Sequence, residues 1–158
     1  MQKQHHYKTQ IIWTGNRGEG TRKYDAYDRN HTLRIENKAD ILCSSDPAFR
    51  GDNTKLNPEE MLLAAISSCH MLWYLHFCAD NKITVVEYVD NAIGKMQELE
   101  TGGGHFTEVI LKPIVTILEP SLVEKANELH AEANKKCFIA NSLNFPVLHQ
   151  PECMVQQG

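Results

Sequence analysis

Cys69 is the side chain best suited to covalent chemistry in this sequence. It lies near the end of the segment Asn57-Pro-Glu-Glu-Met-Leu-Leu-Ala-Ala-Ile-Ser-Ser-Cys-His70, which has the pattern of an apolar helix. A thiol reacts as its thiolate, and burial in apolar surroundings disfavours that charged form. Cys69 is therefore either inert packing or a nucleophile that charges from elsewhere in the chain activate. Thiol redox chemistry is the leading interpretation.

The other cysteines decide whether Cys69 has a partner. The chain contains five, without a CxxC motif or a Cys/His cluster at zinc spacing: Cys43, Cys69, Cys78, Cys137 and Cys153. This pattern favours reduced thiols, a transient functional disulfide and no structural zinc. Cys78 follows Cys69 by nine residues, so it points to the opposite side of a helix and cannot pair with it. Cys137 lies on the apolar stripe of a second predicted helix, where it could meet Cys69 or simply fill the core.

A positive charge is needed to hold Cys69 as a thiolate, because the dipole of its own helix fades within the first turn. Two candidates flank a glycine-rich turn and two lie further along: Arg17, Arg22, Arg34 and Arg50. A buried guanidinium needs an orienting carboxylate, and Glu59 fits that role. Glu59 precedes Cys69 by ten residues, or ~15 Å along one helix. If both belong to one site, the glutamate comes from a second copy of the chain, which predicts a homodimer.

The elements that must position these residues follow from periodicity and turn chemistry. Asn57 suits a helix N-cap, Pro58 suits the first helical position, and Glu59 and Glu60 favour the positive helix end. We expect this helix to end near Asp80-Asn81 and to be buried by a sheet. A second helix is expected from Pro120, with its apolar stripe reaching Cys137 and Ala140. Strands are expected at 7–13, 21–27, 32–37, 83–97, 106–118 and 147–155, with 38–56 as a polar connection.

Length and composition bound the remaining possibilities. The 158 residues suit a single domain over residues 1–158, of α+β class, with an antiparallel sheet wrapped around a buried central helix. A net charge of −4 offers no basic field for nucleic acid or an anionic membrane. The first residues lack the apolar core of a signal peptide, and polar residues interrupt the run from Met61 to Ala79. We therefore expect a cytoplasmic chain.

The segment from Asn57 to His70 resembles the signature of the OsmC/Ohr family of thiol peroxidases. The turn Asn16-Arg-Gly-Glu-Gly-Thr21 and the segment Ala133-Asn-Lys-Lys-Cys137 fall where that family has its other key residues. The resemblance implies an intertwined homodimer with its sites at the subunit interface. It implies that Cys69 attacks an organic hydroperoxide and forms a sulfenic acid, which Cys137 resolves as a disulfide. Arg17 would hold the Cys69 thiolate, and Glu59 would orient Arg17.

The same resemblance implies no cofactor: no metal, haem or flavin. The expected partners are an organic hydroperoxide and a dithiol reductant, with a lipoyl-type dithiol as one option. Many members have proline after the second cysteine, where this chain has Phe138, so the second helix could run on through this position. Arg22 is a rival to Arg17 for activating Cys69.

Two other functions fit the same residues. One is a redox-responsive or small-molecule-binding dimer with little turnover. The other is acyl transfer by Cys69, which needs a general base within reach of the thiol. It is disfavoured because His70 points about 100° away from Cys69 and His76 lies about 10 Å further along the helix. His70 is expected as a hydrogen-bonded core residue, and Trp73 as core packing more than as a pocket wall.

Overall fold

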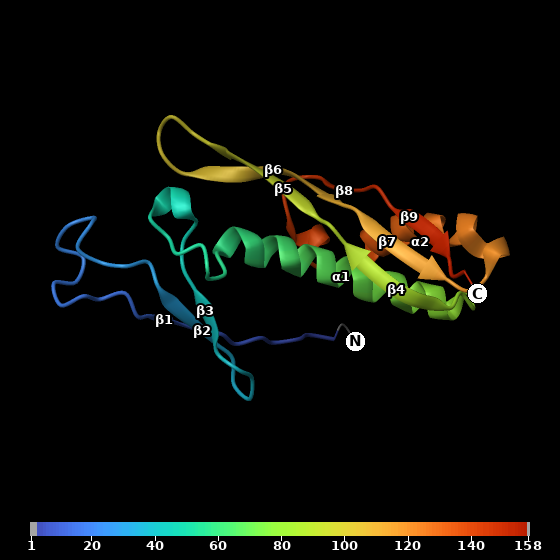
Figure 1. The fold of residues 1–158 in the computed structure, drawn as a ribbon, viewed down its shortest axis with the longest axis horizontal. Helices are drawn as coiled ribbons and strands as arrows, with labels where there is room; N and C mark the ends of the chain where they lie inside the picture. The colour runs from blue at the N-terminus through green and yellow to red at the C-terminus, as the bar shows by residue number, and fades with distance from the viewer. Residues whose placement is uncertain (1–2, 158) are drawn as a thin grey trace. The chain divides into compact units, whose positions relative to one another are not determined.

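Residues 3–157 are described by a computed structural model and form nine β-strands, two α-helices and three short 3₁₀ helices (Figure 1). In chain order these are β1 Gln10–Trp13, β2 His31–Arg34, β3 Ile41–Cys43, η1 Pro47–Phe49, α1 Pro58–Asp80, β4 Val85–Asp90, β5 Ile93–Glu98, β6 Gly104–Leu111, β7 Pro113–Ile117, η2 Pro120–Leu122, α2 Val123–Lys136, η3 Ala140–Ser142, β8 Val147–His149 and β9 Glu152–Val155. Two compact units share the chain, the first extending to Met61 and the second beginning at Leu62.

The first unit contains a three-stranded antiparallel sheet in the order β1-β2-β3. β1 and β2 confirm two of the expected strands. The expected polar connection over 38–56 is wrong in part, because it contains β3 and η1. β3 ends at Cys43, which is buried and also pairs with Leu56. A three-residue strand is too short to show the alternation from which strands are predicted.

The expected strand at 21–27 is also wrong, because arginine side chains bind its backbone instead of a neighbouring strand. Arg29 donates to the carbonyls of Tyr24 and Tyr27 at 2.8 and 2.7 Å. Arg17 donates to the carbonyls of Asp25 and Ala26. Four consecutive carbonyls thus accept from two guanidinium groups, and the segment folds as a loop between β1 and β2.

α1 begins as the sequence predicts. The Asn57 side chain accepts the backbone N–H of Glu60 at 2.8 Å, and the Glu60 carboxylate accepts the backbone N–H of Asn57 at 3.1 Å. This reciprocal pair is a capping box, which satisfies two backbone donors at the helix start. Pro58 occupies the first helical position, and the helix ends at Asp80, as predicted.

The second unit is built on one long β-hairpin with a kink in each arm. β4 and β5 form the first arm, β6 and β7 the second, and pairing keeps one register across the kink between Asp90↔Pro113 and Ile93↔Ile110. The Asp90 carboxylate accepts the backbone N–H of Lys112 at 2.7 Å and the Ser67 hydroxyl at 2.5 Å. These bonds explain why each of the two long expected strands is divided in two.

The last expected strand is likewise divided, into β8 and β9, on either side of Gln150-Pro151. β8 pairs with β6 and β9 pairs with β7, both in parallel and with the same register offset. The α+β class is therefore confirmed. The sheets are mixed, because these parallel pairs join the antiparallel hairpin.

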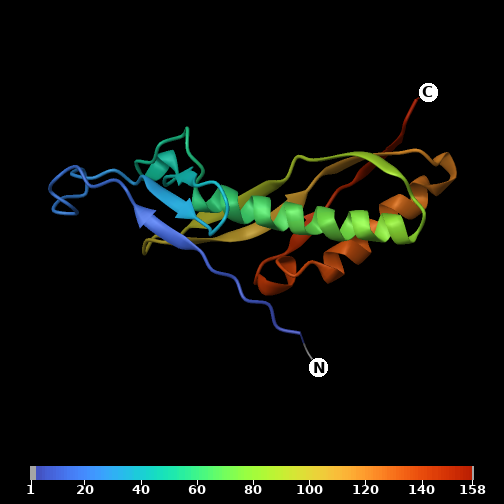
Figure 2. The same ribbon diagram turned by 90° about the horizontal axis from the view of Figure 1, so that it is seen from below.

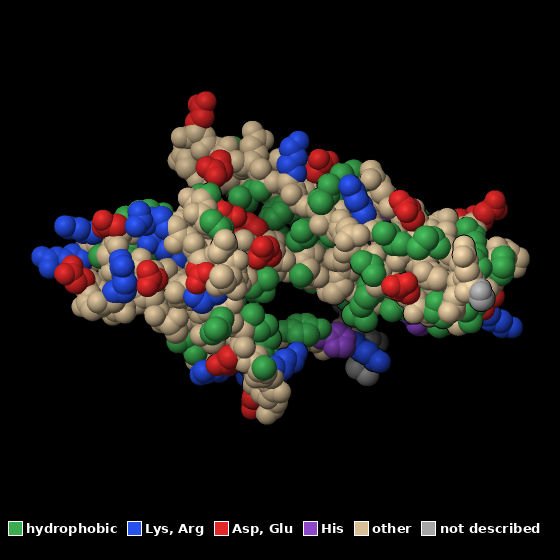
Figure 3. Space-filling view, viewed as in Figure 1, with side chains coloured by type: hydrophobic (Ala, Val, Ile, Leu, Met, Phe, Trp, Pro, Cys, Tyr) green, Lys and Arg blue, Asp and Glu red, His purple; other side chains and the backbone are tan. Residues whose placement is uncertain are grey.

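α1 and α2 lie against one face of this sheet (Figures 1 and 2). The inward residues of α1 form a stripe with a spacing of four: Ile66, His70, Tyr74 and Cys78. The chain therefore buries one stripe of α1 instead of most of its circumference, and Leu72 is 62% exposed. Length and hydropathy alone would also let α1 cross a membrane, a test that core helices of soluble proteins pass as well. Further hydrophobic side chains reach the surface of the second unit (Figure 3).

Candidate active site

Two thiols from distant parts of the sequence meet in the second unit. Cys69 lies on α1, half-buried, and Cys137 follows α2 and is fully buried. The Cys69 thiol is close enough to act on the pKa of Cys137. Both are free thiols, as are the other three cysteines. The structure thus brings together the two cysteines that spacing could only suggest as a pair.

The helix does not run through Cys137, and that expectation is wrong. α2 ends at Lys136, and Cys137 has an extended backbone, with ψ 112°. A new turn starts there: the Cys137 carbonyl accepts the N–H of Asn141 at 3.0 Å, and its Sγ accepts the N–H of Ala140 at 3.4 Å. Cys137 therefore acts as the cap of the turn that follows, without the help of a proline.

The environment of Cys137 keeps it protonated. Burial raises the pKa of this thiol to about 11, and the neighbouring Cys69 adds to the shift. The backbone N–H groups of Ala140 and Ile139 lower the pKa, but burial outweighs them. At neutral pH the buried thiol is thus a poor first nucleophile, because only a thiolate attacks efficiently.

Aromatic side chains pack around Trp73, which follows Cys69 by one helical turn. Trp73, one turn after Cys69 on α1, packs edge-to-face on Phe138, with ring centres 5.8 Å apart. Trp73 also contacts Phe77, with ring centres 5.5 Å apart. A shallow cavity of about 300 Å³ is lined by Leu72, Trp73 and His76. Trp73 therefore serves both as packing and as a cavity wall.

Arg17 belongs to the first unit, in the loop between β1 and β2. Besides the two carbonyls, its guanidinium lies 3.8 Å from the Asp28 carboxylate, and both side chains are half-exposed. Among residues 3–157, no ion pair joins Arg17 to Glu59, which lies in the first turn of α1. The expected pairing of these two residues stays a prediction, as does the assignment of Glu59 to a second copy of the chain.

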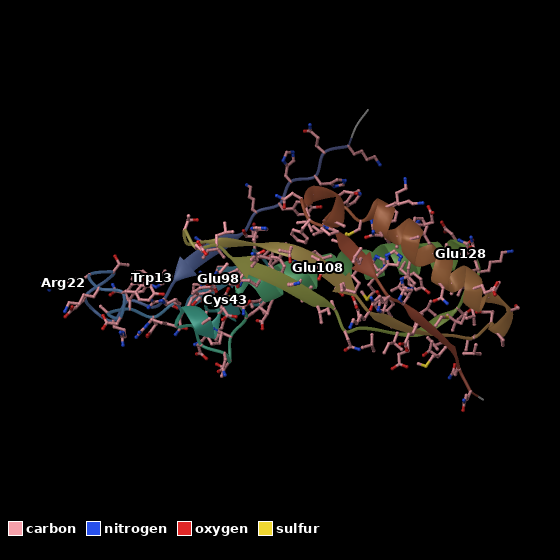
Figure 4. The ribbon with its side chains drawn as sticks, turned by 90° about the horizontal axis from the view of Figure 1, so that it is seen from above. Trp13, Arg22, Cys43, Glu98, Glu108 and Glu128 are labelled. Carbon is pink, nitrogen blue, oxygen red and sulfur yellow. The ribbon has the colours of Figure 1, made fainter. Side chains whose placement is uncertain are left out.

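The other arginine candidates have separate surroundings. Arg34 forms a two-point ion pair with Asp40, at 3.0 and 2.7 Å. Arg50 caps η1 and lies over the ring of Tyr24. Arg22 is exposed on the loop that follows Trp13 (Figure 4). Arg22 therefore stays open as the rival to Arg17.

A buried histidine cluster next to Cys69 was missed by sequence reasoning. His70 Nε2 and His130 Nδ1 form a hydrogen bond of 3.0 Å, and the two ring planes are nearly parallel, at 8°. His149 of β8 lies beside both, with ring centres 6.1 and 6.4 Å away. Tyr74 stacks on His130 at 3.8 Å. His70 is thus the hydrogen-bonded core residue that was expected, and His130 was recognisable from its place on the apolar stripe of α2.

Burial controls the charge of this cluster. It lowers the pKa of His70 to about 4 and that of His130 to about 3, with neighbouring imidazoles adding to both shifts. His70 Nδ1 and His130 Nε2 have no hydrogen-bond partner within residues 3–157. In the same described part of the chain, no group of three or more His, Cys, Asp or Glu side chains is arranged to hold a metal ion.

Comparison with solved structures gives close matches in fold. An OsmC-like protein of unknown function from Vibrio cholerae is 30% identical, with a TM-score of 0.83, covering 94% of this chain and 99% of that one. An organic hydroperoxide resistance protein from Elizabethkingia anophelis is 18% identical, with a TM-score of 0.71, covering 99% and 100%. An organic hydroperoxide resistance protein, OsmC, from Legionella pneumophila is 17% identical, with a TM-score of 0.67, covering 96% and 99%. No curated protein matches the chain.

The family model described as OsmC-like protein matches residues 51–151, which include both helices and both thiols of the candidate site. The Vibrio cholerae protein is similar to this chain in sequence as well, with 30% identity over nearly the full length of both chains. This protein therefore belongs to the OsmC-like family.

Proposed function

We propose that this protein is a thiol peroxidase that reduces organic hydroperoxides to alcohols. The observation that carries the proposal is the meeting of Cys69 and Cys137, one partly exposed on α1 and the other buried after α2. A partly exposed thiol can reach a substrate, and a buried neighbour can form a disulfide with it. The names of the Elizabethkingia and Legionella neighbours point to hydroperoxides as substrates.

The proposed reaction has three steps. The Cys69 thiolate attacks the distal oxygen of ROOH, the O–O bond breaks, and the alkoxide takes a proton to leave as ROH. Cys137 then attacks the sulfur of the Cys69 sulfenic acid, and water leaves as the disulfide forms. A dithiol reductant, for which a lipoyl-type dithiol is one option, returns both cysteines to thiols and becomes a disulfide.

The first step needs a cation beside the Cys69 thiolate, and we assign it to Arg17, with Glu59 as its orienting carboxylate. α1 is continuous from Pro58 to Asp80, so Glu59 and Cys69 of one copy stand ~15 Å apart along it. We therefore assign Glu59 to the site of a partner copy. The exposed apolar side of α1, with Leu72, supplies a surface for such a homodimer.

The organic part of the substrate suits the shallow cavity around Trp73, one helical turn from Cys69. Its walls are Leu72, Trp73 and His76, and Trp73 stands one turn from Cys69. Apolar walls favour a hydroperoxide with an alkyl, acyl or aryl group over hydrogen peroxide. We expect the reaction to take place in the cytoplasm.

One observation favours a second candidate function. The Arg17 guanidinium is already engaged by carbonyls of its own loop and by Asp28. If it stays there, Cys69 reacts slowly, and the protein acts as a redox-responsive or small-molecule-binding dimer. Saturable peroxide turnover with a dithiol supports the peroxidase, and slow consumption without saturation supports this alternative.

The decisive experiment is intact-mass analysis and peptide mapping after one equivalent of cumene hydroperoxide. The peroxidase requires a loss of two hydrogens, localised to a link between Cys69 and Cys137. Cys78→Ser serves as a matched control, because Cys78 is a buried thiol on the same helix, nine residues and about 180° around the helix from Cys69. Unmodified thiols at positions 69 and 137 would overturn the proposal.

A further inference from the structure

Two side-chain pairs near Cys69 join α1 to the turn that follows α2. The first is the thiol pair of Cys69 and Cys137. The second is the edge-to-face contact of Trp73 and Phe138, with ring centres 5.8 Å apart and planes at 83°. Trp73 follows Cys69 by four residues on the helix, and Phe138 follows Cys137 directly. The aromatic pair therefore stands one helical turn from the thiol pair and spans the same two segments.

The exposure of Phe138 is not explained by core packing. Its side chain is 70% exposed, although phenylalanine is usually buried. Trp73 is held on its other sides by His76 and Phe77, with ring centres 5.8 and 5.5 Å away. Phe138 is therefore the outer member of the pair, and its contact with Trp73 fixes the turn more than it builds the core.

The turn that carries Phe138 is tied mainly to itself and to the end of α2. The Ser142 hydroxyl donates to the Phe138 carbonyl at 2.8 Å, and the Asn141 side chain donates to the Lys135 carbonyl at 2.9 Å. On its inner side, Ile139 packs against the core cluster around Ile66. Ile139 anchors the turn from within, and Phe138 anchors it along α1 beside Cys69.

We propose that Phe138 is a positioning residue for disulfide formation: its contact with Trp73 holds Cys137 in reach of the Cys69 sulfenic acid. This inference rests on the proposed peroxidase function and concerns its second step. The sulfenic acid has two fates. Attack by Cys137 gives the disulfide and water, whereas a second ROOH gives the sulfinic acid and ROH. A well-placed Cys137 favours the first fate.

The test is the partition between disulfide and sulfinic acid at Cys69, measured by mass spectrometry over a series of cumene hydroperoxide concentrations. We expect Phe138→Ala to slow disulfide formation about two- to tenfold, the range that one edge-to-face aromatic contact corresponds to. The peroxide concentration that gives equal amounts of the two products falls by the same factor. The rate of the first oxidation, measured by stopped flow, stays unchanged.

Two further variants separate positioning from general stability. Phe138→Tyr keeps the ring and places its hydroxyl toward solvent, so it should restore the wild-type partition. Leu148→Ala removes another exposed apolar side chain, on β8, and should leave the partition unchanged. Wild-type partition in Phe138→Ala, or an equal slowing of both steps, would overturn the inference while the peroxidase stands. A wild-type protein that forms no link between Cys69 and Cys137 would overturn both.

Discussion

The buried histidine pair makes the stability of this fold depend on pH below neutrality. His70 and His130 are both fully buried, and each has its pKa lowered, first by burial and then by neighbouring imidazoles. Protonation of either would place a charge between α1 and α2 without a carboxylate partner among the histidine contacts. Acidification should therefore weaken the packing of the two helices.

The size of the effect follows from the pKa values. Histidine titrates at 6.5 in the unfolded chain, against about 4 for His70 and about 3 for His130 in the folded protein. Below pH 6.5 the unfolded chain binds more protons than the folded one, so stability is lost as the pH falls toward 4. At pH 5 each histidine lowers the free energy of unfolding by about 2 kcal/mol relative to pH 8, and the pair lowers it by about 4 kcal/mol. That is a large part of the 5–15 kcal/mol by which a typical domain is stable.

Urea denaturation at pH 8, 7, 6 and 5, at one protein concentration, measures this slope. His130→Asn removes one titrating group and keeps a hydrogen-bonding atom near the position of Nδ1. The variant should lose about 2 kcal/mol between pH 8 and pH 5, where the wild type loses about 4. His105→Asn changes an exposed histidine on β6 and should keep the wild-type slope. Carboxyl groups with a lowered pKa, such as Asp52, change the free energy of unfolding only below pH 5, outside the measured range.

Two results would refute this reasoning. One is a wild-type free energy of unfolding that changes by less than about 1 kcal/mol between pH 8 and pH 5. The other is an equal slope in the wild type and in His130→Asn, which would assign the acid sensitivity to other groups. A lower stability of His130→Asn at pH 8 alone decides nothing about titration, because the slope is the measured quantity.

Three other predictions address the site and its scaffold. Cys69→Ser should abolish peroxide turnover, whereas Cys137→Ser should consume about one equivalent and stop as a sulfenic acid; sustained dithiol-driven turnover in Cys137→Ser would show that another thiol resolves it. Arg17→Met should slow oxidation of Cys69 about tenfold or more in stopped flow, with Arg22→Met close to wild type, and the reverse order would assign the role to Arg22. Asn57→Ala should lower the free energy of unfolding by about 1 kcal/mol through loss of the capping box, and Asn53→Ala, an exposed control, should not.

Local signals were sufficient for the start and end of α1. Asn57, Pro58 and Glu60 determine the helix start through contacts within four residues, so the sequence alone predicts it. The end of α2 at Lys136 was not predictable in the same way. Nothing in Cys137-Phe138 breaks a helix by propensity, and the break appears only where the Cys137 carbonyl and Sγ accept the N–H groups of the next turn.

Long-range contacts account for the other differences. Asp90 acts on Lys112 and Ser67, which are more than 20 residues away, so the kink in the hairpin could not be read from either strand. β8 pairs in parallel with β6, and β9 pairs in parallel with β7. Both pairings depend on where the chain leaves α2. From the sequence, Cys137 could either meet Cys69 or simply fill the core. The three-dimensional fold brings it to Cys69. The role of Glu59 is expected in the site of a second copy of the chain, which a single sequence does not describe.

Cys69 and Cys137 are 68 residues apart in the sequence, which gives their proposed disulfide a thermodynamic consequence. Closing a loop of that length lowers the conformational entropy of the unfolded chain. In the chain-entropy treatment this raises the free energy of the unfolded state by about 4 kcal/mol. The oxidised protein should therefore melt at a higher temperature than the reduced one. A reductant that restores the thiols also releases this constraint, so each round of peroxide reduction would carry the fold between a more stable and a less stable form.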